Sequence, residues 1–221
     1  MKTRVAGPTA ALAGIPAGLQ AQGPWAGRRQ LFIRFAGEAE TATMYTADAL
    51  ANEIERATAR SRFHSISIGG RDPLGNVEYL TTAFGAKEVK LPVLLDCDGQ
   101  RPEEIKPLGK IVQLVQVSME GSLLNSDGPL TGAIDTMREA AKLGVQHSIV
   151  VVADERTSDS VVLRVVEQAH AASEKTMIVV HPATGTPVDR DRRWTMLLER
   201  AMALHGDVQL ALRLPPPTGT R

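Results

Sequence analysis

Acidic side chains follow most of the short apolar runs of this chain, and they are the residues best placed to bind a ligand. Five of six such runs end in an acidic group, and the sixth ends in histidine. The residues are Glu38, Asp72, Asp96 with Asp98, Glu120, Asp154 with Glu155, and His181. Carboxylates and an imidazole can hold a cation, an amine or a ribose hydroxyl. Since loops meet water, the competing interpretation is a set of ordinary polar loop residues.

Short apolar runs alternate with longer amphipathic runs, and this pattern predicts an α/β fold with parallel strands. The expected strands are Leu31–Phe35, His64–Ile68, Pro92–Asp96, Leu114–Ser118, Ser148–Val152, Met177–Val180 and Val208–Leu212. Apolar residues at helical spacing mark six helices, from one capped by Thr46 to one carrying Trp194. Six or seven strands are too few for a closed eight-stranded barrel. The sequence therefore predicts a partial, open β/α barrel, with a doubly wound sheet as the alternative.

Composition indicates one domain spanning residues 1–221, with irregular ends at 1–25 and 215–221 that are rich in Gly, Pro, Ala and Thr. The formal net charge is zero, so no electrostatic argument favours nucleic acid or an anionic membrane. No stretch approaches the ~20 apolar residues of a membrane span. A single cysteine, Cys97, excludes an internal disulfide and a Cys-based zinc or iron–sulfur site. We expect a cytoplasmic protein without a bound metal.

Ligands of parallel α/β folds bind beyond the carboxyl ends of the strands. Gly69 and Gly70 directly follow an expected strand, where they permit close approach of a ligand to the backbone or merely a tight turn. Ser118 ends another strand. Cys97 also follows a strand, in an apolar context that predicts a buried small side chain rather than a reactive thiol.

Four segments carry a resemblance to a known family. They are Gln20-Ala21-Gln22-Gly23 with Gly27-Arg28-Arg29-Gln30, His64 to Gly70, Leu91 to Gly99, and Val117-Ser118-Met119-Glu120. In order and spacing they resemble 7-carboxy-7-deazaguanine synthase, a dimeric radical S-adenosylmethionine (SAM) enzyme of queuosine biosynthesis with a partial barrel fold. That family places three cluster cysteines where this chain has Glu38, Ala42 and Tyr45. The resemblance thus implies that the [4Fe–4S] cluster is absent, because thiolates hold such clusters.

The strand-end argument and the resemblance together nominate ten ligand-binding residues. They are Gln20, Gln22, Arg28, Gly69, Gly70, Asp72, Asp96, Asp98, Ser118 and His181. Within the resemblance, Arg28 matches a contact to the substrate carboxylate, and Asp72 stands in for the acid that receives the SAM amino group. No residue is assigned a catalytic role.

Three functions follow as hypotheses. The first is a non-catalytic binding or partner subunit, a pseudoenzyme that pairs with itself or joins a larger assembly. The second is a cluster-independent enzyme or sensor that binds a pterin, purine or adenosyl ligand. The third is a lyase with residual 7-carboxy-7-deazaguanine synthase-like activity. No cofactor is expected, although SAM is a possible ligand; partners are a protein and a small molecule, with neither nucleic acid nor membrane.

Overall fold

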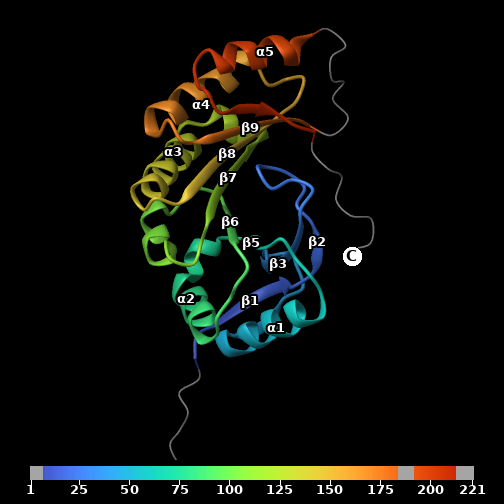
Figure 1. Ribbon diagram of the computed structural model, residues 1–221. Coiled ribbons are helices and arrows are strands. Elements are labelled where there is room, and N and C mark those ends of the chain that lie inside the picture. Colours follow the sequence, from blue (N-terminus) through green and yellow to red (C-terminus); the bar gives the residue numbers. More distant parts are fainter. Residues whose placement is uncertain (1–6, 184–191, 213–221) are drawn as a thin grey trace, which may run out of the picture.

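A computed structural model of the chain describes residues 7–183 and 192–212, which form a twisted sheet with its helices along one face (Figure 1). The strands are β1 (Thr9–Gly14), β2 (Ala17–Leu19), β3 (Arg29–Phe35), β4 (Thr43–Thr46), β5 (Ser65–Gly70), β6 (Val93–Cys97), β7 (Leu114–Glu120), β8 (Gln146–Ala153), β9 (Met177–Pro182) and β10 (Val208–Leu210). The helices are α1 (Ala47–Arg60), α2 (Val77–Ala86), α3 (Asp127–Lys142), α4 (Asp159–Ala172) and α5 (Arg193–Met202). Three 3₁₀ segments are η1 (Pro73–Asn76), η2 (Pro102–Leu108) and η3 (Gly121–Asn125).

The strand order is β10-β9-β8-β7-β6-β5-β3-β1-β4, with β2 also paired to β3. From β3 to β10 all neighbours are parallel, and each parallel strand lies beside the next one along the chain. Right-handed crossovers in a sheet whose order never reverses place every helix on the same face. This order gives a TIM-barrel-like open α/β fold. It differs from the doubly wound alternative, in which the strand order reverses.

All seven predicted strands are confirmed, but the described sheet has ten strands rather than six or seven. The additional strands are β1, β2 and β4, which pair in antiparallel fashion at one side of the sheet. Two of them lie within residues 1–25, where the sequence predicts irregular structure. Alanine and glycine have low strand propensity, so these strands depend on pairing with β3 that the local sequence does not reveal. Residues 215–221 lie outside the described residues.

Alternate side chains of the parallel strands pack against the helices in one apolar core. In β3 these are Leu31, Ile33 and Phe35, and the same alternation runs through the strands to β9. Helix α1 contributes Leu50 and Ile54 to this core, and its cap is the predicted one: Thr46 Oγ1 accepts a hydrogen bond from the Ala49 N–H at 3.1 Å. Burial of this apolar surface is the main stabilising contribution to the fold.

The opposite, concave face of the parallel strands is mixed. Its polar side chains are Gln30, Arg34, Ser65, Ser67, Asp96, Gln116, Ser118, Ser148 and His181, and its apolar ones include Phe32, Leu94, Leu114 and a patch of Val150, Val152 and Val179. Since side chains alternate between faces at a period of two residues, these positions interleave with the core positions of the same strands. The described helices do not cover this face, yet most of its side chains are buried, with Gln30, Gln116 and Ser148 at 0% exposed.

The turn after β5 depends on the absence of a side chain at Gly70. Its φ is +94°, and a Cβ there would lie 2.3 Å from the Phe35 carbonyl oxygen. We therefore expect Gly70→Ala to lower the free energy of unfolding by at least ~1–3 kcal/mol, since both backbone strain and a clash are introduced. Urea denaturation followed by circular dichroism measures this.

Gly85→Ala is the matched control for this change. Gly85 lies in α2, and a Cβ added there would meet no heavy atom within 4 Å. That change is expected to stabilise the helix by ~0.5–1 kcal/mol. An equal loss of stability in both variants would contradict the argument.

Candidate ligand-binding site

A loop of residues 20–28, here called the cap loop, joins β2 to β3 and covers part of the concave face (Figure 1). Two backbone hydrogen bonds close its base: Gln20 N–H donates to the Arg28 carbonyl, and Gly27 N–H donates to the Gln20 carbonyl, both at 2.9 Å. From this base the loop reaches across to β7 and β9. It therefore connects the side of the sheet that carries the antiparallel strands with the far parallel strands.

Ser118 of β7 is the centre of a hydrogen-bond network beneath the cap loop. Its Oγ accepts from Gln22 Nε2 at 2.8 Å and, over a longer 3.4 Å, from Gln116 Nε2. The same hydroxyl donates to Asp96 Oδ1 at 3.1 Å. Three of the predicted residues, Gln22, Asp96 and Ser118, are thus brought together. A hydroxyl that accepts twice and donates once has used its full capacity, so Ser118 is fully occupied by its three partners.

The cap loop makes a second long-range contact through its backbone at Gly23, whose N–H donates to His181 Nε2 at 3.1 Å. Because the backbone N–H is only a donor, Nε2 must be the unprotonated nitrogen, and the neutral ring carries its proton on Nδ1. Gly23 has a φ of +80°, and a Cβ there would lie 1.9 Å from Gln116 Oε1. Only glycine permits this approach of the loop to β7.

A cavity of 280 Å³ opens beside the cap loop on the concave face. Four predicted residues line it: Gln20, Gly69, Gly70 and Asp96. Gly69 leaves the space next to Asp96 open. A Cβ at Gly69 would lie 3.6 Å from the Asp96 Cβ, so a larger side chain would extend into this space. The cavity therefore lies where the strand-end rule places ligands, at the carboxyl halves of β3, β5 and β6.

Arg34 also lines this cavity, although the sequence did not lead us to expect it there. The available signal was alternation, because Arg34 sits between the core residues Ile33 and Phe35 and must point to the other face. Its Nη2 pairs with Glu40 Oε1 at 2.8 Å, and both side chains are exposed. The Gly37 N–H and then the Arg34 charge hold the pKa of Glu40 below its usual value. The Arg34 edge of the cavity thus carries an ion pair, in which Glu40 balances the guanidinium charge.

Unpaired polar atoms gather on the concave face. Among the described residues, Gln22 Oε1, Gln30 Oε1, Gln116 Oε1 and Ser148 Oγ are buried without a hydrogen-bond partner. Buried polar groups are almost always paired, with protein, water or a ligand. Three of these four atoms are amide oxygens, which only accept hydrogen bonds. Gln116 is the register partner of Asp96, and Gln22 bonds Ser118, which also bonds Asp96. With the Asp96 carboxylate these two amide oxygens suit a ligand rich in N–H or O–H donors.

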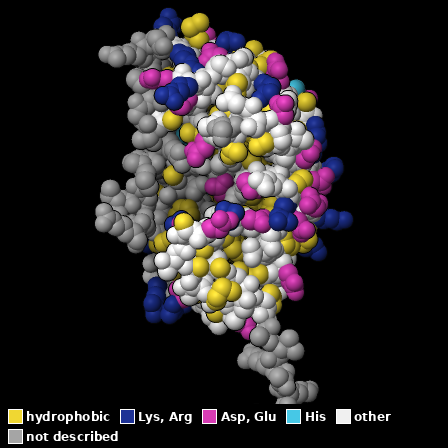
Figure 2. All heavy atoms as spheres, turned by 180° about the vertical axis from the view of Figure 1, so that it is seen from behind, with side chains coloured by type: hydrophobic (Ala, Val, Ile, Leu, Met, Phe, Trp, Pro, Cys, Tyr) yellow, Lys and Arg dark blue, Asp and Glu magenta, His cyan; other side chains and the backbone are white. Residues whose placement is uncertain are grey.

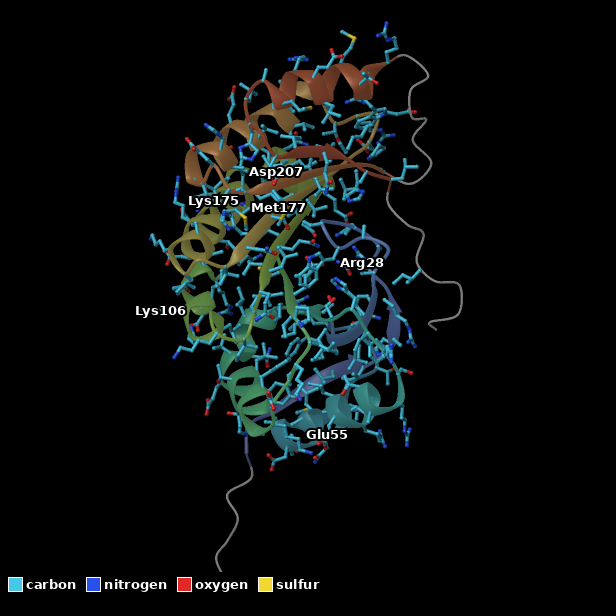
Figure 3. The ribbon with its side chains drawn as sticks, in the orientation of Figure 1. Arg28, Glu55, Lys106, Lys175, Met177 and Asp207 are labelled. Atoms are coloured by element: carbon cyan, nitrogen blue, oxygen red, sulfur yellow. The ribbon has the colours of Figure 1, made fainter. Side chains whose placement is uncertain are left out.

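Three predicted residues lie away from this network. Asp72 accepts two hydrogen bonds from Arg101, at 3.0 and 3.1 Å, and one from the Gly75 N–H at the start of η1. Asp98 is exposed and accepts from the Gln100 N–H at 3.0 Å. Arg28 is exposed at the end of the cap loop, on the side of the molecule away from α2 and α3 (Figure 3).

His64 immediately precedes β5 and lies beside the cap loop, near Arg28 and Trp25. Burial and then the nearby Arg28 charge lower the pKa of His64. Its Nδ1 lies 2.9 Å from Ser65 Oγ, and its ring meets Trp25 of the cap loop edge-on, with 5.2 Å between ring centroids. A neutral imidazole packed against Trp25 helps to position the loop.

The positions interpreted as lost cluster ligands form ordinary structure. Glu38 is exposed and pairs with Arg71 at 2.6 Å. Ala42 is exposed before β4, and Tyr45 lies within β4, opposite Ala10 of β1. Cys97 is buried in the core on the helix side of β6, and this burial raises the pKa of its thiol to about 12. A thiol in such a position packs rather than reacts.

Other cavities as large as the 280 Å³ cavity, or larger, lie elsewhere on the molecule. One of 680 Å³ lies on the helix side, beside α1 and the end of α2, where Lys87 already bonds Asn52 and Glu55. Another of 300 Å³ includes Lys175, Met177 and Asp207, which lie near the starts of β9 and β10 (Figure 3). Charged side chains of both signs are interspersed over the face shown in Figure 2. We favour the concave cavity because unpaired buried atoms occur beside it.

Comparisons with known proteins identify no family. No protein-family model and no curated protein match the chain. Among solved structures, apo 3-keto-D-glucoside 4-epimerase from E. coli matches with a TM-score of 0.43 and 14% identity, over 76% of this chain and 75% of that one. Similarity at this level supports no inference about activity.

The resemblance to 7-carboxy-7-deazaguanine synthase was wrong. None of these comparisons supports a radical SAM family, and the solved structure described above is that of an epimerase. The assignments to queuosine biosynthesis and to a lost cluster fall with it. Short motifs of apolar residues followed by Gly, Ser or Asp arise wherever a buried parallel strand meets its loop. Several such motifs in order therefore reflect an α/β architecture, and only the partial barrel expected from the resemblance agrees with the structure.

Two features are absent from the part of the chain that the structure describes. It contains no group of three or more His, Cys, Asp or Glu side chains arranged to hold a metal ion. Within residues 7–183 and 192–212, every helix falls short of the length and apolar character needed to cross a bilayer. The predictions about cofactors, partners and cellular location stay predictions.

The Ser118 network can be tested through stability. Ser118→Ala removes the acceptor for Gln22 Nε2 and the donor to Asp96, so we expect the free energy of unfolding to fall by ~1–3 kcal/mol. Chemical denaturation gives the value. Ser67→Ala is the control, because Ser67 is buried on the same face and lines the cavity, and we expect a change of only ~0.5 kcal/mol there. Equal effects at the two serines would show that the network contributes no particular stability.

Proposed function

We propose that this protein is a non-catalytic binding protein for a small ligand rich in hydrogen-bond donors, held on the concave face. The ligand class that we favour is an amino-substituted heterocycle such as a pterin or purine. The observation that carries the proposal is the pair of unpaired acceptor oxygens next to Asp96, which lines the cavity: Gln116 is the register partner of Asp96, and Gln22 bonds the same serine as Asp96, Ser118.

The chemistry of the cavity supports this ligand class. An amino group next to a ring N–H presents two parallel donors, and a carboxylate such as Asp96 accepts two such bonds well. Arg34, across the cavity, is paired with Glu40 through Nη2, and its planar guanidinium can stack on a ring. Ligand sites usually measure ~300–1,000 Å³, and a cavity of 280 Å³ is close to the lower limit. A single ring system therefore suits it better than a dinucleotide.

A second candidate function is that of a partner subunit, and the edge of the sheet favours it. Strand β4 ends the described strand order, pairing with β1 on one side, and its Met44 is 65% exposed. An exposed strand edge is a template for pairing with another chain. We expect sedimentation velocity to show a concentration-dependent dimer that Met44→Lys weakens, because a lysine on an edge strand opposes pairing. A chain that stays monomeric at all concentrations would contradict this candidate.

The ligand proposal is tested by isothermal titration of the purified chain with pterin, guanine, adenosine and, as a polyol control, glucose. We expect one of the heterocycles to bind, and Asp96→Asn to weaken it at least ~10-fold, or about 1.4 kcal/mol. Asp98→Asn is the matched control, since Asp98 is exposed and engaged in a local turn, and we expect a change below ~3-fold.

Three outcomes oppose the proposal. No binding of any probe at millimolar concentration would remove it, and binding of glucose alone would overturn the heterocycle class. Equal losses in Asp96→Asn and Asp98→Asn would place the site elsewhere. Mass spectrometry of the recovered ligand separates the binding protein from the enzyme hypothesis, because a binding protein returns its ligand unchanged.

A further inference from the structure

A row of polar side chains continues from the cavity across the sheet. The part of this row made by Gln116 and Ser148 is here called the floor beneath the cap loop. Asp96, Gln116 and Ser148 are register partners on the neighbouring strands β6, β7 and β8. Gln116 and Ser148 are each 0% exposed, and Gln116 Oε1 and Ser148 Oγ have no hydrogen-bond partner among the described residues. Because Gln116 lies beside Asp96 in this row, the two unpaired atoms continue the site that the cavity begins.

The cap loop occupies the space above this part of the row. Gly23 approaches Gln116 so closely that not even a Cβ fits between them. Yet the loop brings no donor to Gln116 Oε1, and Gln22 places its own Oε1 nearby without a partner in the described structure. The closed loop therefore excludes other groups from the floor without satisfying the floor's acceptors, an arrangement that is unfavourable for buried polar atoms.

We propose that Gln116 and Ser148 form an inner part of the ligand site, and that the cap loop and the ligand compete for it. A ligand with donors at both ends would bind Asp96 through one edge and present N–H or O–H groups to Gln116 and Ser148 through the other. The claim that Gln116 and Ser148 bind the ligand, here called the ligand part, rests on the proposed function. The claim that the cap loop opens, here called the loop part, does not. When the loop opens, its groups leave the floor, and a donor-rich ligand takes their place.

Few hydrogen bonds of the described residues hold the closed loop to the strands, as this competition requires. Away from its hydrogen-bonded base, the loop is tied to the sheet by the Gln22–Ser118 bond, the Gly23–His181 bond and the packing of Trp25 on His64. Gly23 and Gly27 have φ values of +80° and +78°, near the two ends of the segment that would move. Segments held by few long-range hydrogen bonds open locally at low cost compared with global unfolding.

The experiment compares Gly23→Ala with Gly27→Ala in hydrogen exchange monitored by mass spectrometry, without any ligand. Both changes strain a residue with nearly the same φ, but only the Gly23 Cβ meets Gln116, since nothing lies within 4 Å of the Gly27 Cβ position. We expect exchange of the 20–28 amides to be at least ~10-fold faster in Gly23→Ala than in Gly27→Ala, with the core strands unchanged in both. Tryptic cleavage at Arg28 should accelerate in parallel. Equal exchange in the two variants would overturn the loop part of the proposal.

Gln22→Ala tests the same point without altering the backbone, should Gly23→Ala fail to fold. It removes the bond to Ser118 and is expected to raise exchange of the loop amides in the same direction. Unchanged exchange in Gln22→Ala would also count against the competition.

The ligand part is tested with the heterocycle that binds in the titration. We expect Gly23→Ala to bind it more tightly than Gly27→Ala, by ~3- to 10-fold, and Gln116→Met to weaken it ~10-fold. Unchanged affinity in Gln116→Met would remove Gln116 from the site. If no probe binds the wild-type chain, the proposed function fails while the exchange data still decide whether the loop opens.

Discussion

The alternation of side chains along the parallel strands separates an apolar face from a polar face, and the site depends on that separation. In β3, Ile33 and Phe35 pack into the core while Arg34, between them, reaches the cavity. In β6, Leu95 and Cys97 are core residues on either side of Asp96. The same backbone hydrogen bonds that hold the strands in register thus set the spacing of the polar row. A slip of one residue in any strand would exchange core and site residues.

The burial that stabilises the fold also keeps the polar face rigid. Helices pack on one side only, so the strands are fixed from behind while their polar side chains point away from the core. Ser118 depends on this support: its neighbours Val117 and Met119 are buried against the helices, and its hydroxyl holds Asp96 of the adjacent strand in position. Preorganised polar groups lose little freedom when a ligand binds.

Much of this architecture is readable from the sequence, because buried parallel strands and amphipathic helices leave strong periodic signals. The runs around Ile33, Leu95 and Ile149 identify the strands without reference to any other protein. Gly69, Gly70 and Asp96 could be placed at the cavity from the strand-end rule alone. By contrast, β1 and β2 carry weak propensities and form through pairing with β3, so the cap loop between β2 and β3 could not be anticipated. The motifs that resembled 7-carboxy-7-deazaguanine synthase gave a wrong family, because they repeat the strand-to-loop pattern common to α/β folds.

The openness of the sheet explains why a loop takes part in the site at all. In a closed eight-stranded barrel, side chains from strands across the barrel fill the interior and satisfy one another. Here seven parallel strands form a path with two ends, and the described strands do not close it into a barrel. The cap loop supplies part of what is missing: Gln22 faces Ser118, and the Gly23 backbone faces His181. It leaves Gln116 Oε1 and Ser148 Oγ unsatisfied, because the Gln22 amide donates to Ser118 and the Gly23 N–H donates to His181 instead. The unpaired oxygens on this face thus follow from the same open topology that makes room for a ligand.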